Sequence, residues 1–261
     1  KAAEEPAKPE VAVEQPSAED EQRAKAEAAE KAEKAAEAKE QQFLKRAVEY
    51  ISLVTPTHFA PFAGTYTLGS RLAKLTNFRG VPSVSYATEY LNEAVKGTSK
   101  GIHLEQFDTY DCMSGVITKS DMKFDLSREQ YVEKISKEAL DYDNDNWNDE
   151  ELVDLIAKAY RRFKSKAEEI EFTSATKLVV RSENIAFQLG TDSDVEIIPV
   201  GSNLIEPYVR IDVDHNLLHR LLRGPRYAHW NNAEIGSHLT YLRKPNNFER
   251  GLYHCMCFLH A

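Results

Sequence analysis

The strongest constraint on the fold of this chain is an abrupt change of composition at Phe43. The preceding segment, residues 23–42, reads RAKAEAAEKAEKAAEAKEQQ and is almost entirely Ala, Glu and Lys. These residues favour helix, and Glu and Lys three or four positions apart form weak surface pairs. No apolar stripe precedes Phe43, so this helix has nothing to bury there. We expect a solvated helical linker, with a partner-binding helix as the alternative.

The first 22 residues are rich in Pro and Glu and offer little to bury. Such a composition is typical of disorder. Ser17 and Asp20 have the spacing of a capping box that starts the helix. Residues 1–42 are therefore predicted to form a charged segment that passes from disordered to helical.

Residues 43–97 carry the first pattern that can pack. Their apolar spacing and turn residues predict a helix over 43–54 with one apolar face (Phe43, Leu44, Ala47, Tyr50, Ile51, Val54), a buried strand over 58–62, a loop over 64–80 with one helical turn, and a helix over 82–95 capped by Ser83 or Ser85. Thr55-Pro56 should end the first helix. This is part of an α/β layer, and because one strand cannot form a sheet, its sheet must be supplied from elsewhere.

Residues 101–261 show more elements. Helices are predicted within 126–142, 148–170, 214–224 and 246–261, and strands within 101–119, 176–190, 194–201, 206–214 and 233–245. Asn148 or Asp149 should cap the second of these helices, and Asp214 and Gly224 should bound the third. The final helix should bury Phe248, Leu252, Cys255 and Leu259. The order predicts an α+β domain with an open sheet and helices on one side.

Charge and cysteine content exclude several classes of function. The 261-residue chain has a formal net charge of -9, which argues against a general nucleic-acid binder. No apolar run is long enough to span a bilayer. Three Cys residues do not form a disulfide framework, so we expect a reducing, cytoplasmic location.

Two acidic or thiol-rich stretches could suggest metals. Asp141, Asp143 and Asp145 match the first ligands of a calcium loop, but Asn146 and Leu152 occupy its required Gly and Glu positions. In residues 254–260, HCMCFLH, the two Cys point to different faces of a helix and cannot converge on zinc. We favour a capping loop and a core helix, and predict no metal ligand and no cofactor in this chain.

The densest polar and aromatic stretch is residues 224–245. A pocket could use its aromatic rings for stacking, its Arg for an anionic group and its Asn for orientation. The candidate substrate-binding residues are Arg226, His229, Trp230, Asn232 and His238. The alternative is a turn into a strand, with Trp230 as a core anchor.

The sequence QQFLKRAVEYISLVTPTHFAPFAGTYTLGSRLAKLTNFRGVPS, residues 41–83, resembles the last part of metallo-β-lactamase-fold hydrolases. The branch it resembles contains CMP-N-acetylneuraminate hydroxylase and the ascorbate-phosphate lactonases. In that family a Pro-x-His-type turn carries the last metal ligand, and Ala63 occupies the place of that His here. GPRYAHWNNAEIGSHL, residues 224–239, is similar to the C-terminal extension of the branch. IDVDHNLLHRLLRG, residues 211–224, resembles a sterol-carrier-like domain.

The resemblance implies a closing helix-strand-loop-helix of the metallo-β-lactamase-like fold over 43–97 and a sterol-carrier-like domain over 101–261. It also implies that the metal-binding motif lies upstream of this chain, which begins with Lys and which we expect to be processed or partial. Zinc or iron would then belong to the complete protein, and the missing N-terminal half would be a partner.

On this reading the chain is inactive alone and contributes the loop from Gly64 to Gly80 to the rim of an active site. Tyr66 would offer its hydroxyl to substrate or a developing oxyanion. Arg79 would pair with an anionic substrate group, and Gly64 is a further candidate substrate-binding residue.

Two other hypotheses remain open. Residues 101–261 could be a binding module for an apolar or anionic small molecule, or could mediate homo-oligomer formation. The whole chain could also be structural, with a charged tether joined to an interaction domain.

Overall fold

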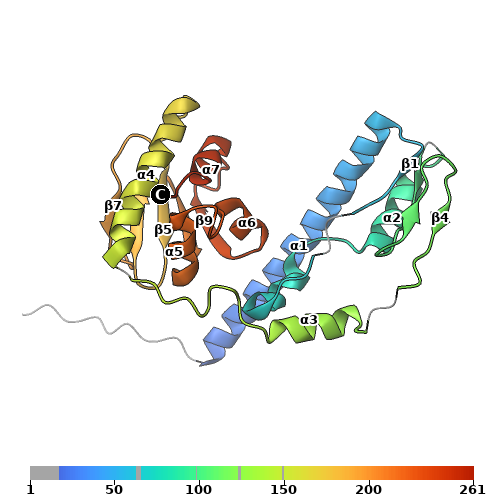
Figure 1. The fold of residues 1–261 in the computed structure, drawn as a ribbon, viewed down its shortest axis with the longest axis horizontal. Helices are drawn as coiled ribbons and strands as arrows, with labels where there is room; N and C mark the ends of the chain where they lie inside the picture. The colour runs from blue at the N-terminus through green and yellow to red at the C-terminus, as the bar shows by residue number, and fades with distance from the viewer. Residues whose placement is uncertain (1–17, 63–65, 98, 123–124, 149) are drawn as a thin grey trace, which may run out of the picture. The chain divides into compact units, whose positions relative to one another are not determined.

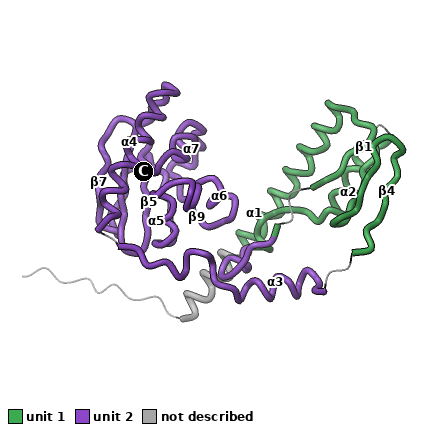
Figure 2. The backbone as a smooth tube through the Cα atoms, in the orientation of Figure 1, with its two compact units in different colours: residues 1–66, 76–124 green, residues 67–75, 125–261 purple. Residues whose placement is uncertain are grey.

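The structure is a computed structural model that describes residues 18–62, 66–97, 99–122, 125–148 and 150–261. The chain forms two compact units, coloured green and purple in Figure 2. Unit 1 contains residues 1–66 and 76–124, and unit 2 contains residues 67–75 and 125–261. Three residues named in the predictions lie outside the described residues: the capping residue Ser17, Ala63 in the place of the metal-binding His, and Gly64 at the start of the rim loop.

Unit 1 begins with the long helix α1, Ala18–Val54, drawn in blue in Figure 1, which ends before Thr55 as predicted. Its apolar face is narrower than expected. Leu44 and Ile51 are buried, with Ala47 and Val48 packed nearby. The predicted partners on the flanks of this stripe, Phe43, Tyr50 and Val54, are exposed.

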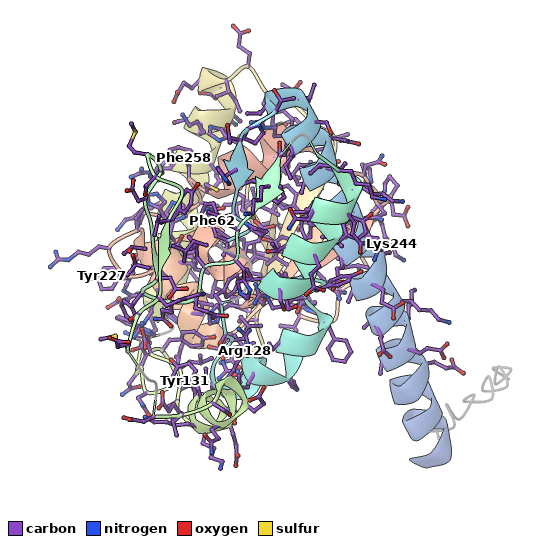
Figure 3. The ribbon with its side chains drawn as sticks, turned by 90° about the vertical axis from the view of Figure 1, so that its right-hand side faces the viewer. Phe62, Arg128, Tyr131, Tyr227, Lys244 and Phe258 are labelled. Carbon is purple, nitrogen blue, oxygen red and sulfur yellow. The ribbon has the colours of Figure 1, made fainter. Side chains whose placement is uncertain are left out.

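A pair of two-residue strands forms the centre of unit 1. β1, His58–Phe59, pairs in parallel with β2, Lys100–Gly101. The predicted buried strand over 58–62 is therefore wrong in length, because Pro61 has no N–H to donate to a ladder. The side chain of Phe62, labelled in Figure 3, is 86% exposed.

The remaining elements of unit 1 are short. β3, Thr109–Tyr110, pairs with β4, Ile117–Thr118, in an antiparallel hairpin. Helix α2, Val84–Ala94, is capped by Ser83, whose side chain accepts from the N–H of Tyr86, as predicted. The 3₁₀ helix η1, Ser70–Phe78, occupies most of the stretch predicted as a loop, and its residues up to Leu75 belong to unit 2.

Unit 2 is built on a five-stranded mixed sheet in the order β7-β6-β5-β8-β9. Its strands are β5, Lys177–Arg181; β6, Ala186–Leu189; β7, Glu196–Ile198; β8, Tyr208–Val213; and β9, Leu239–Lys244. β5 and β8 are parallel, and the other neighbours are antiparallel. This confirms the mixed α+β class predicted for this region.

The core of unit 2 lies between this sheet and its helices. The helices of unit 2 are α3, Arg128–Ser136; α4, Glu150–Glu169; α5, His215–Arg223; α6, Trp230–Ile235; and α7, Arg250–Met256. Of these, α3 adds no residue to the core. Alternate residues of β8, Val209, Ile211 and Val213, enter the core. Leu152 and Ile156 of α4 meet them from the helical layer, as the helical period requires.

Local capping fixes α4 and α5 as predicted. The side chain of Asn148 accepts from the N–H of Glu150 at the start of α4. Asp214 accepts from the N–H groups of Asn216 and Leu217, and Gly224 ends α5 with φ 105°.

Other boundaries in unit 2 differ from the prediction. The predicted strand over 233–245 begins only at Leu239, because the side chain of His229 caps α6 and Trp230 is buried there. α3 ends at Ser136 and buries none of its residues. Phe248 precedes α7 and is 64% exposed rather than buried, whereas Leu252, Cys255 and Leu259 are in the core. Within the described residues, no helix has the length and apolarity needed to cross a membrane.

Candidate functional site

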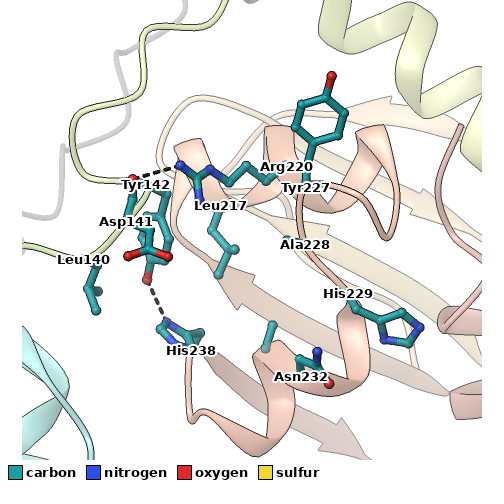
Figure 4. Close-up of a pocket in the computed structure, with 11 residues that line it drawn as sticks. Leu140, Asp141, Tyr142, Leu217, Arg220, Tyr227, Ala228, His229, Asn232 and His238 are labelled. Atoms are coloured by element: carbon teal, nitrogen blue, oxygen red, sulfur yellow. Dashed lines mark hydrogen bonds between the residues drawn. The ribbon is translucent and has the colours of Figure 1, made fainter.

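Unit 2 contains a pocket of about 400 Å³, shown in Figure 4. Its walls come from the loop before α4, from α5, from α6 and the turn that leads into it, and from the residue before β9. Leu140, Leu217, Ala228 and Ala233 supply apolar surface. The ionisable or amide side chains in the lining are Asp141, Tyr142, Arg220, Tyr227, His229, Asn232 and His238.

Tyr142 and His238 form the best-defined pair in this pocket. The Tyr142 hydroxyl lies 2.8 Å from Nδ1 of His238, and the two rings meet edge to face. Burial raises the pKa of Tyr142 to about 12. Burial, and then the charge of Arg71, lower the pKa of His238. The phenol is therefore protonated and the imidazole neutral at neutral pH.

Arg71 of η1 contacts the Tyr142 member of this pair. Its guanidinium donates to Asp143 at 2.6 Å, to Asp214 at 2.8 Å, and to the Tyr142 hydroxyl at 3.4 Å. It also lies 5.4 Å from the centre of the Tyr142 ring, within range of a cation–π contact. Asp214 is also the cap of α5, so these contacts join η1, the Tyr142 loop and α5.

Arg220 of α5 is fixed in the same loop. Its Nε and Nη2 donate to the two carboxylate oxygens of Asp145 at 2.5 and 2.9 Å, and Nη2 also donates to the carbonyl of Asp141 at 2.8 Å. A bidentate pair of this kind fixes orientation as well as charge. The Asp145 carboxyl has a lowered pKa, first because of the hydrogen bond from Arg220.

The three aspartates of the calcium-loop spacing do not converge. Asp143 is bound by Arg71 and Asp145 by Arg220. Across the part of the chain that the structure describes, no three His, Cys, Asp or Glu side chains gather in a way that could hold a metal ion. In HCMCFLH, Cys255 is a fully buried core residue, in keeping with the core reading of that helix.

The structure brings three of the predicted substrate-binding residues to one pocket. His229, Asn232 and His238 all line it. Trp230 does not, since it is 1% exposed and its Nε1 donates to the carbonyl of Leu259 at 2.7 Å. Trp230 is thus the core anchor of the alternative reading.

The other two predicted substrate-binding residues are not part of this pocket. Arg226 is exposed and outside the lining. Gly64 falls among the residues that are not described.

The two predicted catalytic residues of unit 1 contact each other. The guanidinium of Arg79 lies 3.5 Å from the centre of the Tyr66 ring, and Nη1 of Arg79 donates to the Tyr66 carbonyl. The Tyr66 side chain remains partly exposed. Their role at the rim of an active site stays a prediction.

Comparisons with known proteins add no relative to this description: no family model, no curated protein and no solved structure matched the chain.

Proposed function

We propose that unit 2 is a binding module for a small polar molecule, which occupies the pocket between the Tyr142 loop, α5 and α6. The observation that carries this proposal is the Tyr142–His238 hydrogen bond inside the pocket. Binding sites typically combine apolar walls with a few polar groups held in fixed positions. Here Arg71 holds Tyr142, and Asp145 holds Arg220.

A ligand screen on the full chain tests this proposal. A library of small polar compounds is screened by ligand-observed NMR, and binders are titrated against the wild type and His238→Gln. His254→Gln is the matched control, because His254 is an exposed histidine outside the pocket lining. We expect binders whose affinity falls at least about tenfold in His238→Gln and is unchanged in His254→Gln. The proposal would be overturned if every binder had the same affinity for His238→Gln as for the wild type, or if no compound in the library bound.

A second candidate function concerns unit 1. Parallel strands are almost always found inside larger sheets, yet β1 and β2 are a parallel pair of two residues each. Leu53, Val54 and Phe62 are 82%, 71% and 86% exposed. These features support the proposal that unit 1 is completed by further polypeptide, as the C-terminal part of a metallo-β-lactamase-fold hydrolase would be.

In that protein the upstream part would hold zinc or iron, and the Tyr66–Arg79 loop would lie at the rim of the site. The product of the complete gene should then contain tightly bound metal and show lactonase or esterase turnover. Arg79→Ala should lower that turnover. The control variant Arg46→Ala should not, because Arg46 is an exposed residue of α1. A metal-free product without either activity would end this proposal.

We also propose that the protein works in a reducing, cytoplasmic compartment. Cys112, Cys255 and Cys257 are all free thiols, and structural disulfides are typical of oxidising compartments. Localisation of the tagged complete gene product by fluorescence tests this. A signal confined to an oxidising compartment would contradict it.

A further inference from the structure

We infer that the pocket of unit 2 takes a small molecule with an ammonium group and a carboxylate or carbonyl oxygen close by, such as the zwitterion of an α-amino acid. This inference rests on the proposed binding function and names its ligand class. It follows from the hydrogen-bonding roles that the structure assigns to His238, Arg220 and Asp141.

We assign the Tyr142 hydroxyl as the donor to Nδ1 of His238 at 2.8 Å. This direction leaves the lone pairs of the Tyr142 oxygen for the N–H of Arg71, whose Nη2 lies 3.4 Å away. A neutral imidazole that accepts at Nδ1 carries its proton on Nε2. His238 therefore presents a donor, not an acceptor, at the other edge of its ring.

This Nε2–H donor has no hydrogen-bond partner among the residues described. The same holds for Nη1 of Arg220, whose Nε and Nη2 are used by Asp145 and Asp141. The exposed Asn232 amide adds a group that can donate or accept. The half-buried His238 and Arg220 thus offer donors, which require acceptor oxygens on the ligand.

Asp141 supplies the opposite polarity. Its backbone carbonyl holds Arg220, while its carboxylate makes no hydrogen bond to any described residue and belongs to an exposed residue of the lining. Figure 4 shows this carboxylate on the same side of the pocket as the Tyr142–His238 pair. A ligand ammonium group is the complement of such a carboxylate.

The local charge balance argues against a simple anion. Asp143 and Asp214 are paired with Arg71, and Asp145 is paired with Arg220. With Asp141 included, carboxylates outnumber guanidinium groups in this cluster by four to two. An anion without a positive group would meet this excess of negative charge, whereas a zwitterion brings its own compensation.

The size and walls of the pocket fit such a ligand. A volume of about 400 Å³ lies at the lower end of the range for small-molecule sites. Leu140 and Leu217 line it beside the polar groups, so the ligand's carbon skeleton has apolar surface to contact. The ligand oxygen would then lie at Nε2 of His238 and its amine at Asp141.

The test compares matched probes on the full chain. The twenty amino acids, their amides, and the corresponding acids without the amino group are screened by saturation-transfer NMR. Each binder is then titrated against the wild type, Asp141→Asn and Asp154→Asn. Asp141→Asn retains the backbone contact to Arg220. Asp154, an exposed residue of α4 outside the lining, is the matched control.

We expect binding by at least one amino acid or amide and by none of the des-amino acids. Asp141→Asn should weaken the binder about tenfold or more, the effect of losing one charge-assisted hydrogen bond, and Asp154→Asn should not. Des-amino acids that bind the wild type as well as the amino acids do, or that displace them, would overturn the zwitterion inference and leave the binding function intact. If none of the probes binds, the inference also fails, and the wider screen of polar compounds decides the binding function separately.

Discussion

The hydroxyl of Tyr142 lies 2.8 Å from Nδ1 of His238, although 96 residues separate them in the chain. Tyr142 comes from the loop before α4, and His238 directly precedes β9. The Tyr142 loop is also tied to α5, since the side-chain amide of Asn216 donates to the Tyr142 carbonyl at 3.0 Å. The pocket therefore forms only when the fold brings these distant segments together.

Tyr142→Phe should lower the free energy of unfolding by about 1 kcal/mol, because it removes one partly buried hydrogen bond and leaves Nδ1 of His238 without its donor. It should also weaken ligand binding, since the His238 tautomer is no longer fixed. Urea denaturation and ¹⁵N spectra of the imidazole measure the two effects. Tyr131→Phe, at an exposed tyrosine of α3, is the control. An unchanged imidazole spectrum in Tyr142→Phe would contradict the tautomer assignment.

Mild acid should destabilise unit 2 through His238. Its pKa in the folded state lies below the ordinary 6.5, because of burial and then of the Arg71 charge, opposed by Asp214 and Asp141. The unfolded chain therefore binds a proton first as the pH falls. The stability contribution is complete above about pH 6.5 and is lost as the pH falls towards the lower, folded pKa.

Denaturation at pH 7.5 and 5.5 checks this prediction. His238→Gln should show a smaller loss of stability between the two pH values. A residual loss should remain, because burial also lowers the pKa of His260. An equal pH dependence in wild type and His238→Gln would refute the assignment to His238.

Gly236→Ala should disturb the pocket without changing its charges. A Cβ at Gly236 would lie 2.6 Å from Cδ2 and 2.9 Å from Nε2 of His238, closer than non-bonded atoms approach. The ring must then move, and the Tyr142 bond should lengthen or break. We expect weaker ligand binding and a modest loss of stability. Gly201→Ala, where a Cβ would meet nothing within 4 Å, is the control, and equal behaviour of the two variants would show that the ring has room to yield.

Trp230→Phe should act on stability and not on binding. The change removes the Nε1 donor and leaves the buried carbonyl of Leu259 unpaired, which should cost about 1–3 kcal/mol. Thermal or urea denaturation measures this loss, and titration below the midpoint measures affinity. If Trp230→Phe had wild-type stability but reduced ligand affinity, this prediction would be wrong and Trp230 would be a binding residue.

Much of unit 2 could be predicted from its sequence because its signals are local. The caps Asn148 and Asp214, Gly224 at the end of α5, and the Val- and Ile-rich strands each act over a few residues. α6 escaped prediction because its six residues carry no helical apolar stripe. Its cap is the side chain of His229, which is not among the usual capping residues.

Only the part of the pocket that comes from residues 224–245 could be predicted from the sequence. The 224–245 segment pointed to His229, Asn232 and His238 because its polar and aromatic residues are dense. Tyr142 and Arg220 were not identified, since each acquires its role from a partner more than 70 residues away. The Asp-rich loop has the spacing of the first calcium ligands. In the fold its aspartates are instead paired with arginines, Asp143 with Arg71 and Asp145 with Arg220.

Unit 2 is made of two separate stretches of the chain, and Arg71 shows why this matters for recombination and protein engineering. It belongs to residues 67–75, which are part of unit 2 but are flanked on both sides by unit 1. A gene segment that starts at residue 125, or even at residue 101, omits this arginine and leaves Asp143 and Asp214 facing each other without their shared cation. Unit 2 therefore cannot be transferred intact as one continuous segment. Recombination or domain grafting would have to transfer residues 67–75 together with residues 125–261.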